Sequence, residues 1–179
     1  MTKILIRFAS IVLLATHFAS AEPAKVINIK ADAALKVFTH KVEGAEEFLS
    51  KVAGYLVFPE VIKGGFLIGG EYGEGVLHVK GKKRDYYRIL SASIGFQAGF
   101  QKRSYIIAFL SEKMLENFIR SDGWEAGVDG SIAVVDWGIG RDINSMSFEK
   151  PIYAFVFDAK GLMYNLTLEG TKFQRIVPK

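Results

Sequence analysis

The chain has 179 residues, a formal net charge of +4 and no cysteine. This length allows one domain with a hydrophobic core. Half of the residues are hydrophobic, and 14 Phe and 7 Tyr are among them, which excludes a disordered chain and favours a β-rich core. The absence of cysteine excludes disulfides, thiol chemistry and a lipid-modified cysteine. The charge is too small to indicate nucleic-acid binding, so we expect no nucleic-acid partner.

The first 21 residues have the pattern of a secretory signal. Lys3 and Arg7 precede an apolar run over residues 8–14, and small residues follow up to Ala21. The run is too short to span a bilayer. We predict cleavage after Ala21, which leaves residues 22–179 as one mature domain; the loss of two of the 23 basic side chains leaves 21 against 19 acidic ones. The predicted protein is exported, either periplasmic or peripherally attached to the envelope membrane, and a retained N-terminal anchor is the alternative.

Residues 31–53 have the spacing of an amphipathic helix. Apolar residues recur every three or four positions, as at Phe38 and Phe48, which is what one helix face requires. Gly44 costs roughly 1 kcal/mol relative to alanine inside a helix, so a break into two shorter helices is expected there. The other face mixes lysine with glutamate, and we expect the helix to pack on a sheet.

From residue 60 onward, β-branched and aromatic residues alternate with glycine. The strictest alternation lies in residues 90–101, where one face carries Leu90, Ala92, Ile94, Phe96, Ala98 and Phe100. The other face is small or polar, so the pattern predicts a strand with its apolar face buried. Lys102 and Arg103 are then expected to form a turn into a second strand.

The C-terminal third is predicted from its turn signals. Ser111 is a suitable N-cap for a short helix that ends near Gly123. Residues 131–137 read as a buried strand, and residues 158–161 as the turn of a last hairpin, with a positive φ at Gly161. The predicted fold class is α+β and β-rich: an N-terminal amphipathic helix packed on a strongly curved antiparallel sheet or barrel, with one short helix between strands.

The sequence carries no catalytic or metal-binding motif. His40 and His78 are the histidines beyond the signal, and H-x-H, H-E-x-x-H and G-x-S-x-G patterns are absent. Glu71 and Glu74 form a close carboxylate pair, which we expect to be solvated. We therefore predict a protein that is not an enzyme, with no catalytic residue, no metal and no cofactor. A hydrolase whose site is assembled in space around His40 or His78 is an alternative.

Six glycines lie within residues 63–77, KGGFLIGGEYGEGVL. A P-loop requires G-x-x-x-x-G-K-[ST], and a dinucleotide fingerprint requires G-x-G-x-x-G between a strand and a helix. Neither pattern is present, and the residues that follow are typical of a strand. We interpret these glycines as bulges and bends of a curved sheet, at places where another backbone comes close.

A basic cluster follows the glycine-rich segment. It consists of Lys80, Lys82, Lys83 and Arg84, with Tyr86 and Tyr87 just beyond. Such a cluster is either a solvated loop between strands or a surface for anionic lipid head groups, with amphipathic tyrosine rings at the interface.

Four segments resemble, in order and spacing, the SYLF-domain family of lipid-binding proteins. They are GYLVFPEVIKGGFLIGGEYGEGVL from Gly54, YYRILSASIGFQAGFQ from Tyr86, SDGWEAGVDGSIAVVD from Ser121 and YAFVFDAKGLMYNLTLEGTKFQRI from Tyr153. The resemblance extends over residues 31–176. It implies a non-enzymatic module that binds lipids. Eukaryotic members are associated with phosphoinositides through an N-terminal amphipathic helix, and with actin where further domains are present.

The resemblance also implies which residues contact lipid. Carried onto the helix over residues 31–53, it places head-group contacts at Lys36, Lys41 and Lys51. The signal sequence and the lack of an accessory domain match an exported, single-domain bacterial branch, so anionic phospholipid or a membrane surface is the expected partner.

We therefore predict lipid or anionic membrane binding in the bacterial cell envelope. The helix and the basic loop would meet head groups, and rings such as Phe38, Phe48, Tyr86 or Tyr87 would reach the acyl boundary. The alternative is a structural or protein-interaction component of the envelope, with an envelope protein as partner and lipid contact incidental.

Overall fold

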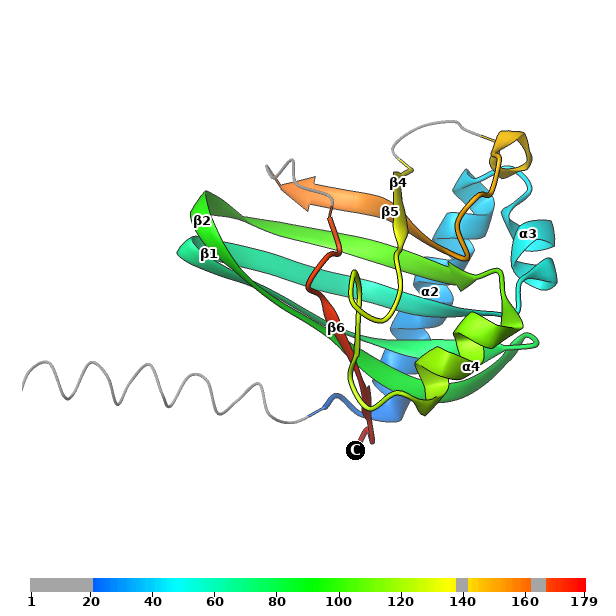
Figure 1. The fold of residues 1–179 in the computed structure, drawn as a ribbon, viewed down its shortest axis with the longest axis horizontal. Helices are drawn as coiled ribbons and strands as arrows, with labels where there is room; N and C mark the ends of the chain where they lie inside the picture. The colour runs from blue at the N-terminus through cyan, green and yellow to red at the C-terminus, as the bar shows by residue number, and fades with distance from the viewer. Residues whose placement is uncertain (1–20, 138–141, 162–166) are drawn as a thin grey trace, which may run out of the picture.

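The computed structural model describes residues 21–137, 142–161 and 167–179, except for the side chains of residues 66–67 and 93–98. A strongly curved β-sheet forms its centre. Helices α2 (Ala24–Lys41) and α3 (Ala45–Lys51) cover the outer face of the sheet, and α4 (Glu112–Arg120) closes one end of the inner face (Figure 1). The predicted fold class is confirmed.

The N-terminal helix is present and is broken where the sequence predicts. Gly44 has a φ of +76°, a left-handed conformation that glycine adopts without steric cost, and it separates α2 from α3. α2 begins earlier than expected, at Ala24, because Ile27 adds one more turn to its buried stripe of Ile27, Ala31, Ala34 and Phe38. The stripe packs on the outer face of the sheet, against Phe155 and Phe157 among others.

Two long strands dominate the sheet. β1 (Gly54–Val79) and β2 (Lys82–Phe109) pair antiparallel along their whole length, from Gly54 opposite Phe109 to Val79 opposite Lys82, and a tight turn at Lys80 and Gly81 joins them. Both strands turn back half-way, at the left of Figure 1. Each therefore has two arms: residues 54–62 and 72–79 of β1, and residues 82–90 and 101–109 of β2. We call the residues between the arms, 63–71 and 91–100, the bend.

The glycine-rich segment is bent strand, as predicted. A Cβ at Gly73 would lie 2.7 Å from the backbone oxygen of Glu60, and one at Gly75 would overlap the backbone oxygen of Val57. The second arm of β1 therefore passes directly against the first arm, and only glycine leaves room for the contact. The expectation that another backbone comes close is confirmed at Gly73 and Gly75, whereas a Cβ at Gly64 would meet only ordinary contacts of 3.7 Å.

The turn predicted at Lys102 and Arg103 is wrong. β2 continues through both residues without a break, with Lys102 opposite Ile62 and Arg103 opposite Val61. The faces at this end of the expected strand are also reversed, because Phe100 is 61% exposed whereas Gln101 is buried. Arg103 is buried next in the same strand, where its guanidinium pairs with the carboxylate of Glu71 in the bend. The side chains of residues 93–98 lie outside the described part.

The remaining strands extend the sheet at both ends. β5 (Ile152–Gly161) pairs antiparallel with the second arm of β2, and β4 (Ala133–Asp136) pairs with β5. The β4–β5 pair is parallel, which corrects the expectation of a purely antiparallel sheet; the crossover between them includes a short 3-10 turn at Ile143–Ser145. β4 is half-buried at the sheet edge, not fully buried as predicted.

The turn predicted at residues 158–161 is wrong. Gly161 has the expected positive φ of +110°, but β5 runs on to Gly161 instead of turning at residue 158. Residues 162–166 of the expected second strand lie outside the described residues. β6 (Lys172–Ile176) pairs with the first arm of β2 and with β3 (Trp124–Glu125), not with β5. This placement buries Phe173 in the inner core.

The inner core is centred on the short helix predicted after Ser111. Phe118 of α4 is buried and lies within 6.0 Å, between ring centroids, of four aromatic rings: Tyr87, Phe109, Trp124 and Phe173. Aromatic pairs at such distances add roughly 0.5–1.5 kcal/mol each to the gain from burial. The four rings come from both arms of β2 and from β3 and β6, so α4 ties the two ends of the curved sheet together.

The glycine contact predicts a position-specific cost of substitution. We expect Gly75→Ala to lower the free energy of unfolding by about 3 kcal/mol, because the new methyl group would force the two arms of β1 apart. The measurement is urea unfolding followed by circular dichroism. Gly64→Ala is the matched control, since its Cβ would meet its nearest neighbours at an ordinary 3.7 Å and should leave stability equal or about 0.5–1 kcal/mol higher. Equal costs at the two positions would contradict the close approach.

Candidate functional site

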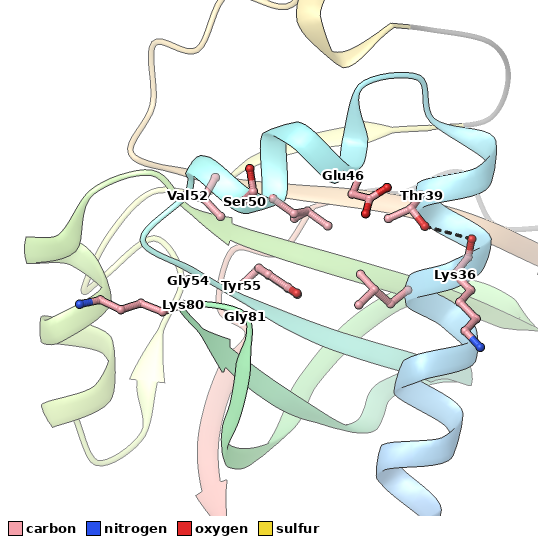
Figure 2. Close-up of a pocket in the computed structure, with 11 residues that line it drawn as sticks. Lys36, Thr39, Glu46, Ser50, Val52, Gly54, Tyr55, Lys80 and Gly81 are labelled. Carbon is pink, nitrogen blue, oxygen red and sulfur yellow. Dashed lines mark hydrogen bonds between the residues drawn. The ribbon is translucent and has the colours of Figure 1, made fainter.

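A hollow of about 640 Å³ lies between α2, α3 and the β1–β2 turn (Figure 2). Its floor is apolar and its rim is polar. The floor is lined by Leu35, Leu49, Val52 and Tyr55, and the rim by Lys36, Thr39, Glu46, Ser50 and Lys80. Lys36 and Lys80 stand at opposite ends of the hollow in Figure 2. The break at Gly44 forms the hollow, because it turns the chain so that α3 lies beside α2.

The bend of the hairpin brings Lys80 to this place. A Cβ at Gly54 would lie 2.9 Å from the backbone oxygen of His78, so the end of β1 returns to its own beginning. Lys80 follows immediately, with a φ of +51° at the turn. The helix and the basic loop, which are separate segments of the sequence, therefore meet around one hollow.

Tyr55 is the polar residue of the floor, and His78 packs against it from outside the lining of the hollow. Their rings stack at 4.8 Å with an interplanar angle of 14°. Burial raises the pKa of the Tyr55 hydroxyl, and the charge of Asp32 raises it further. Burial lowers the pKa of His78, and the Lys83 ammonium lowers it further while Asp32 opposes the change. His78 is thus held in its neutral form beneath the basic turn.

The predicted cations fall into two groups. Lys83 bonds Asp32 of α2 at 2.6 Å, Arg84 lies 3.4 Å from Asp85, and Lys51 pairs with Glu47 within α3. In the described part of the chain, no carboxylate lies within ion-pair distance of Lys36, Lys41, Lys80 or Lys82. All seven cations are exposed. The unpaired ones are the better suited to an external anion, because no internal carboxylate competes for them.

Lys41 differs in its surroundings from Lys36 and Lys80. It lies at the end of α2, on a shallow groove that it shares with Glu43, Glu46 and Glu47. We call Lys36 and Lys80, together with Lys82 beside the turn, the basic rim. The structure places Lys36 and Lys80 on one hollow with Lys82 two residues beyond Lys80, and leaves Lys41 and Lys51 among acidic neighbours.

The aromatic part of the predicted site is largely wrong. Tyr87 and Phe38 are 1% and 0% exposed, so neither ring is available to a membrane. Tyr87 alternates with Ile89 on the inner face and packs on Phe118, whereas Phe38 belongs to the outer core. Tyr86 is half-buried, and its hydroxyl accepts a hydrogen bond from Asn28 Nδ2 at 2.9 Å. Phe48 is half-buried and stacks on Phe148.

The carboxylate pair in the glycine-rich segment is not solvated, contrary to expectation. Glu71 is buried and contacts Arg103 and Tyr105, whose positions on the second arm of β2 were not predicted to be a site. Glu74 is buried at the other face, where it accepts hydrogen bonds from the Tyr72 hydroxyl and the backbone N–H of Glu22. Strict alternation backwards from Ile107 through Tyr105 would have placed Arg103 inside.

The arrangement supports non-covalent binding. A rim of cations over an apolar floor can hold a molecule that has both an anionic and an apolar part. Among the described residues, no group of three or more His, Cys, Asp or Glu side chains is placed to hold a metal ion. No helix in that part of the chain is both long and apolar enough to cross a membrane.

Residues 90–175 match the model of a protein family described as Las17-binding protein actin regulator, Ysc84, which is the family of the SYLF domain. This segment belongs to the SYLF-domain family. The match begins at the end of the first arm of β2 and includes α4 and the strands from β3 to β6. A comparison with curated proteins found no match. β1 lies before the matched SYLF segment but is paired with β2 along its whole length.

The surroundings of His78 predict a pH dependence of stability. The unfolded chain takes up a proton on this side chain near pH 6.5, whereas the folded chain does so only at lower pH because the pKa of His78 is lowered. Falling pH therefore favours the unfolded state between these two values. We expect the free energy of unfolding to fall as the pH drops below about 6.5, and to fall less in His78→Gln.

An NMR titration of the imidazole signals checks the cause. Lys83→Ser should raise the pKa of His78, because it removes a positive charge from its surroundings. Lys113→Ser, on α4, should leave it unchanged. A pKa of His78 above 6.5 in the unsubstituted protein would contradict the assigned environment.

Proposed function

We propose that the chain is a non-enzymatic protein that binds anionic lipid, and that the basic rim and the hollow beneath it are the contact surface. The observation that carries the proposal is that Lys36 and Lys80, from distant parts of the chain, line one hollow with an apolar floor. The family match adds support, since lipid binding is associated with SYLF domains.

The geometry suits a head group at the surface better than an extended acyl chain. The floor of the hollow is formed by side chains that are themselves packed in the outer core, such as Leu49 and Tyr55. The flexible ammonium groups of Lys36 and Lys80 would each meet a phosphate at its own end of the hollow. The hydroxyls of Thr39 and Ser50 on the same rim already donate to the backbone oxygens of Lys36 and Glu47, so the lysines are the donors left for a head group.

The location belongs to the same proposal. An exported protein attached to the outer leaflet of an inner membrane, or held in the periplasm, would meet anionic bacterial phospholipid, and the pattern of residues 1–21 supports export. In this proposal residues 22–179 act as one lipid-binding unit. Attachment would be reversible, because three cations near an anionic surface contribute only about 1 kcal/mol each.

A protein partner is the second candidate. It is favoured by the description of the matching family, which names a regulator that binds another protein. The groove lined by Lys41, Glu43, Glu46 and Glu47 carries both charge signs, as the polar rim of a protein interface does. A pull-down from envelope extract that survives delipidation, and that is lost on reversing Glu46 and Glu47 to lysine, would support this candidate over lipid binding.

Lipid binding is tested by co-sedimentation with liposomes of rising phosphatidylglycerol content at low salt. We expect the fraction of pelleted protein to rise with anionic lipid and to fall with salt. In the triple variant Lys36→Ser, Lys80→Ser, Lys82→Ser, the loss of about 3 kcal/mol should weaken binding about 100-fold.

The control variant removes equal charge elsewhere. Lys113, Lys160 and Lys172 are exposed and lie on α4, β5 and β6. Their replacement by serine should weaken binding far less than the rim variant does. If the unsubstituted protein stays in the supernatant at every lipid composition, or if both triple variants behave alike, the assignment of the basic rim fails.

A further inference from the structure

A buried charged cluster lies on the inner face of the sheet, next to the bend. Its members come from the two ends of the bend of β1 and from the second arm of β2, and they are Lys63, Glu71, Gln101, Arg103 and Tyr105. Arg103 is 0% exposed, and the others are at most 6% exposed. Lys63 lies opposite Gln101 in the β1–β2 register, and Arg103 lies opposite Val61. The cluster borders the inner hydrophobic core through Val61 and Tyr105.

One carboxylate holds the cluster together. Glu71 Oε1 lies 3.1 Å from Arg103 Nη2 and accepts a hydrogen bond of 2.9 Å from the Tyr105 hydroxyl. The guanidinium carbon of Arg103 lies 5.1 Å from the centre of the Tyr105 ring. Glu71 therefore links the end of the bend of β1 to the second arm of β2 across the inside of the sheet.

The ion pair with Glu71 leaves other N–H groups of Arg103 without an acceptor in the described part of the chain. Its Nε and Nη1 atoms are buried and have no hydrogen-bond acceptor among the described residues. A guanidinium carries five N–H donors, and a buried charged group with unpaired donors is costly to the folded state. Arg103 is fully buried, so bulk solvent does not reach these donors.

The cluster also has an excess of positive charge. Lys63 and Arg103 face the single carboxylate of Glu71, and Lys63 makes no ion pair in the described part of the chain. Burial lowers the pKa of Lys63, while Glu71 acts to raise it. An anion placed between the two cations would satisfy the donors and balance the charge together.

We propose that Arg103 and Lys63 form an anion-binding site inside the curved sheet, which takes a phosphate or a carboxylate group. Both groups accept several hydrogen bonds from a guanidinium at once, and both are bound more strongly in a site of low dielectric than in water. The group can belong to a free anion or to an amphiphile whose alkyl chain lies against the neighbouring inner core. The site is separate from the basic rim, so the inference does not rest on the proposed function.

The test uses three probes with the purified protein: inorganic phosphate, decanoate, and vesicles that contain phosphatidylglycerol. The first readout is the Nε–H signal of Arg103 in 15N NMR, and the second is the midpoint of thermal unfolding. Binding of free anion predicts that phosphate shifts both readouts. Binding of an amphiphile predicts that decanoate or the vesicles do so and phosphate does not. If none of the three moves the Arg103 signal, the proposal is wrong.

Substitutions separate binding from a merely structural role. Glu71→Gln removes the internal competitor for Arg103, so anion-dependent stabilisation should be greater than in the unsubstituted protein, with binding at least tenfold tighter. Lys63→Met should weaken binding about tenfold, as expected for the loss of one charge-assisted contact. A purely structural Arg103 would give no anion dependence in any of these variants.

The double variant Arg103→Met, Glu71→Gln removes the charged pair as a unit. Replacing a buried ion pair with neutral groups of similar size often leaves stability unchanged or higher, so this variant should fold and yet lose all response to the probes. A response that persists in it would overturn the assignment. The rim variant Lys36→Ser, Lys80→Ser, Lys82→Ser should lose vesicle pelleting and keep its response to phosphate or decanoate, which distinguishes failure of this site from failure of the proposed function.

Discussion

The close passage of the two arms of β1 is the constraint on which the rest of the structure depends. The backbone at Gly73 and Gly75 lies against Glu60 and Val57 of the same strand, and this contact closes the sheet on itself. It creates an inner face that is filled by one aromatic core and an outer face that α2 crosses. It also returns the β1–β2 turn to the start of β1, which places Lys80 beside α3. Without the bend there would be two long strands and no common site.

Local features of the fold could be predicted from the sequence, because local physics determines them. The helix break follows from the conformational freedom of Gly44. α4 lies between Ser111 and Gly123, the two end signals that predict it, although the Ser111 side chain makes no capping hydrogen bond. The curved sheet follows from glycines set among strand-forming residues. Local sequence features could not show that the strand continues through Lys102 and Arg103. Two adjacent cations are usually solvated. Arg103 is buried because its guanidinium pairs with the carboxylate of Glu71 in the bend, 32 residues away in the chain.

Single residues of the candidate site could be predicted from the sequence, but their meeting around one hollow could not. Lys36 and Lys80 are both suggested by sequence, but only the paths of α2 and β1 bring them around one hollow. The burial of Tyr87 was predictable from the sequence, because strand alternation puts Tyr87 on the same face as the apolar Ile89. The parallel pairing of β4 with β5 depends on a crossover that no local pattern encodes.

The pairing of β6 has a consequence for the order in which the chain can fold. The β1–β2 turn joins residues that are neighbours in sequence, so pairing can start there and extend outward at little entropic cost. Residues 172–176 instead pair with residues 86–90, and closing so long a loop is slow. The inner core needs Phe173 from this last strand, so α4 and the first arm of β2 stay partly uncovered until the C-terminal residues have been synthesised. α4 and the first arm of β2, which are synthesised earlier, thus depend for their burial on β6, which is synthesised last. A chain that lacks a few C-terminal residues should therefore not fold at all.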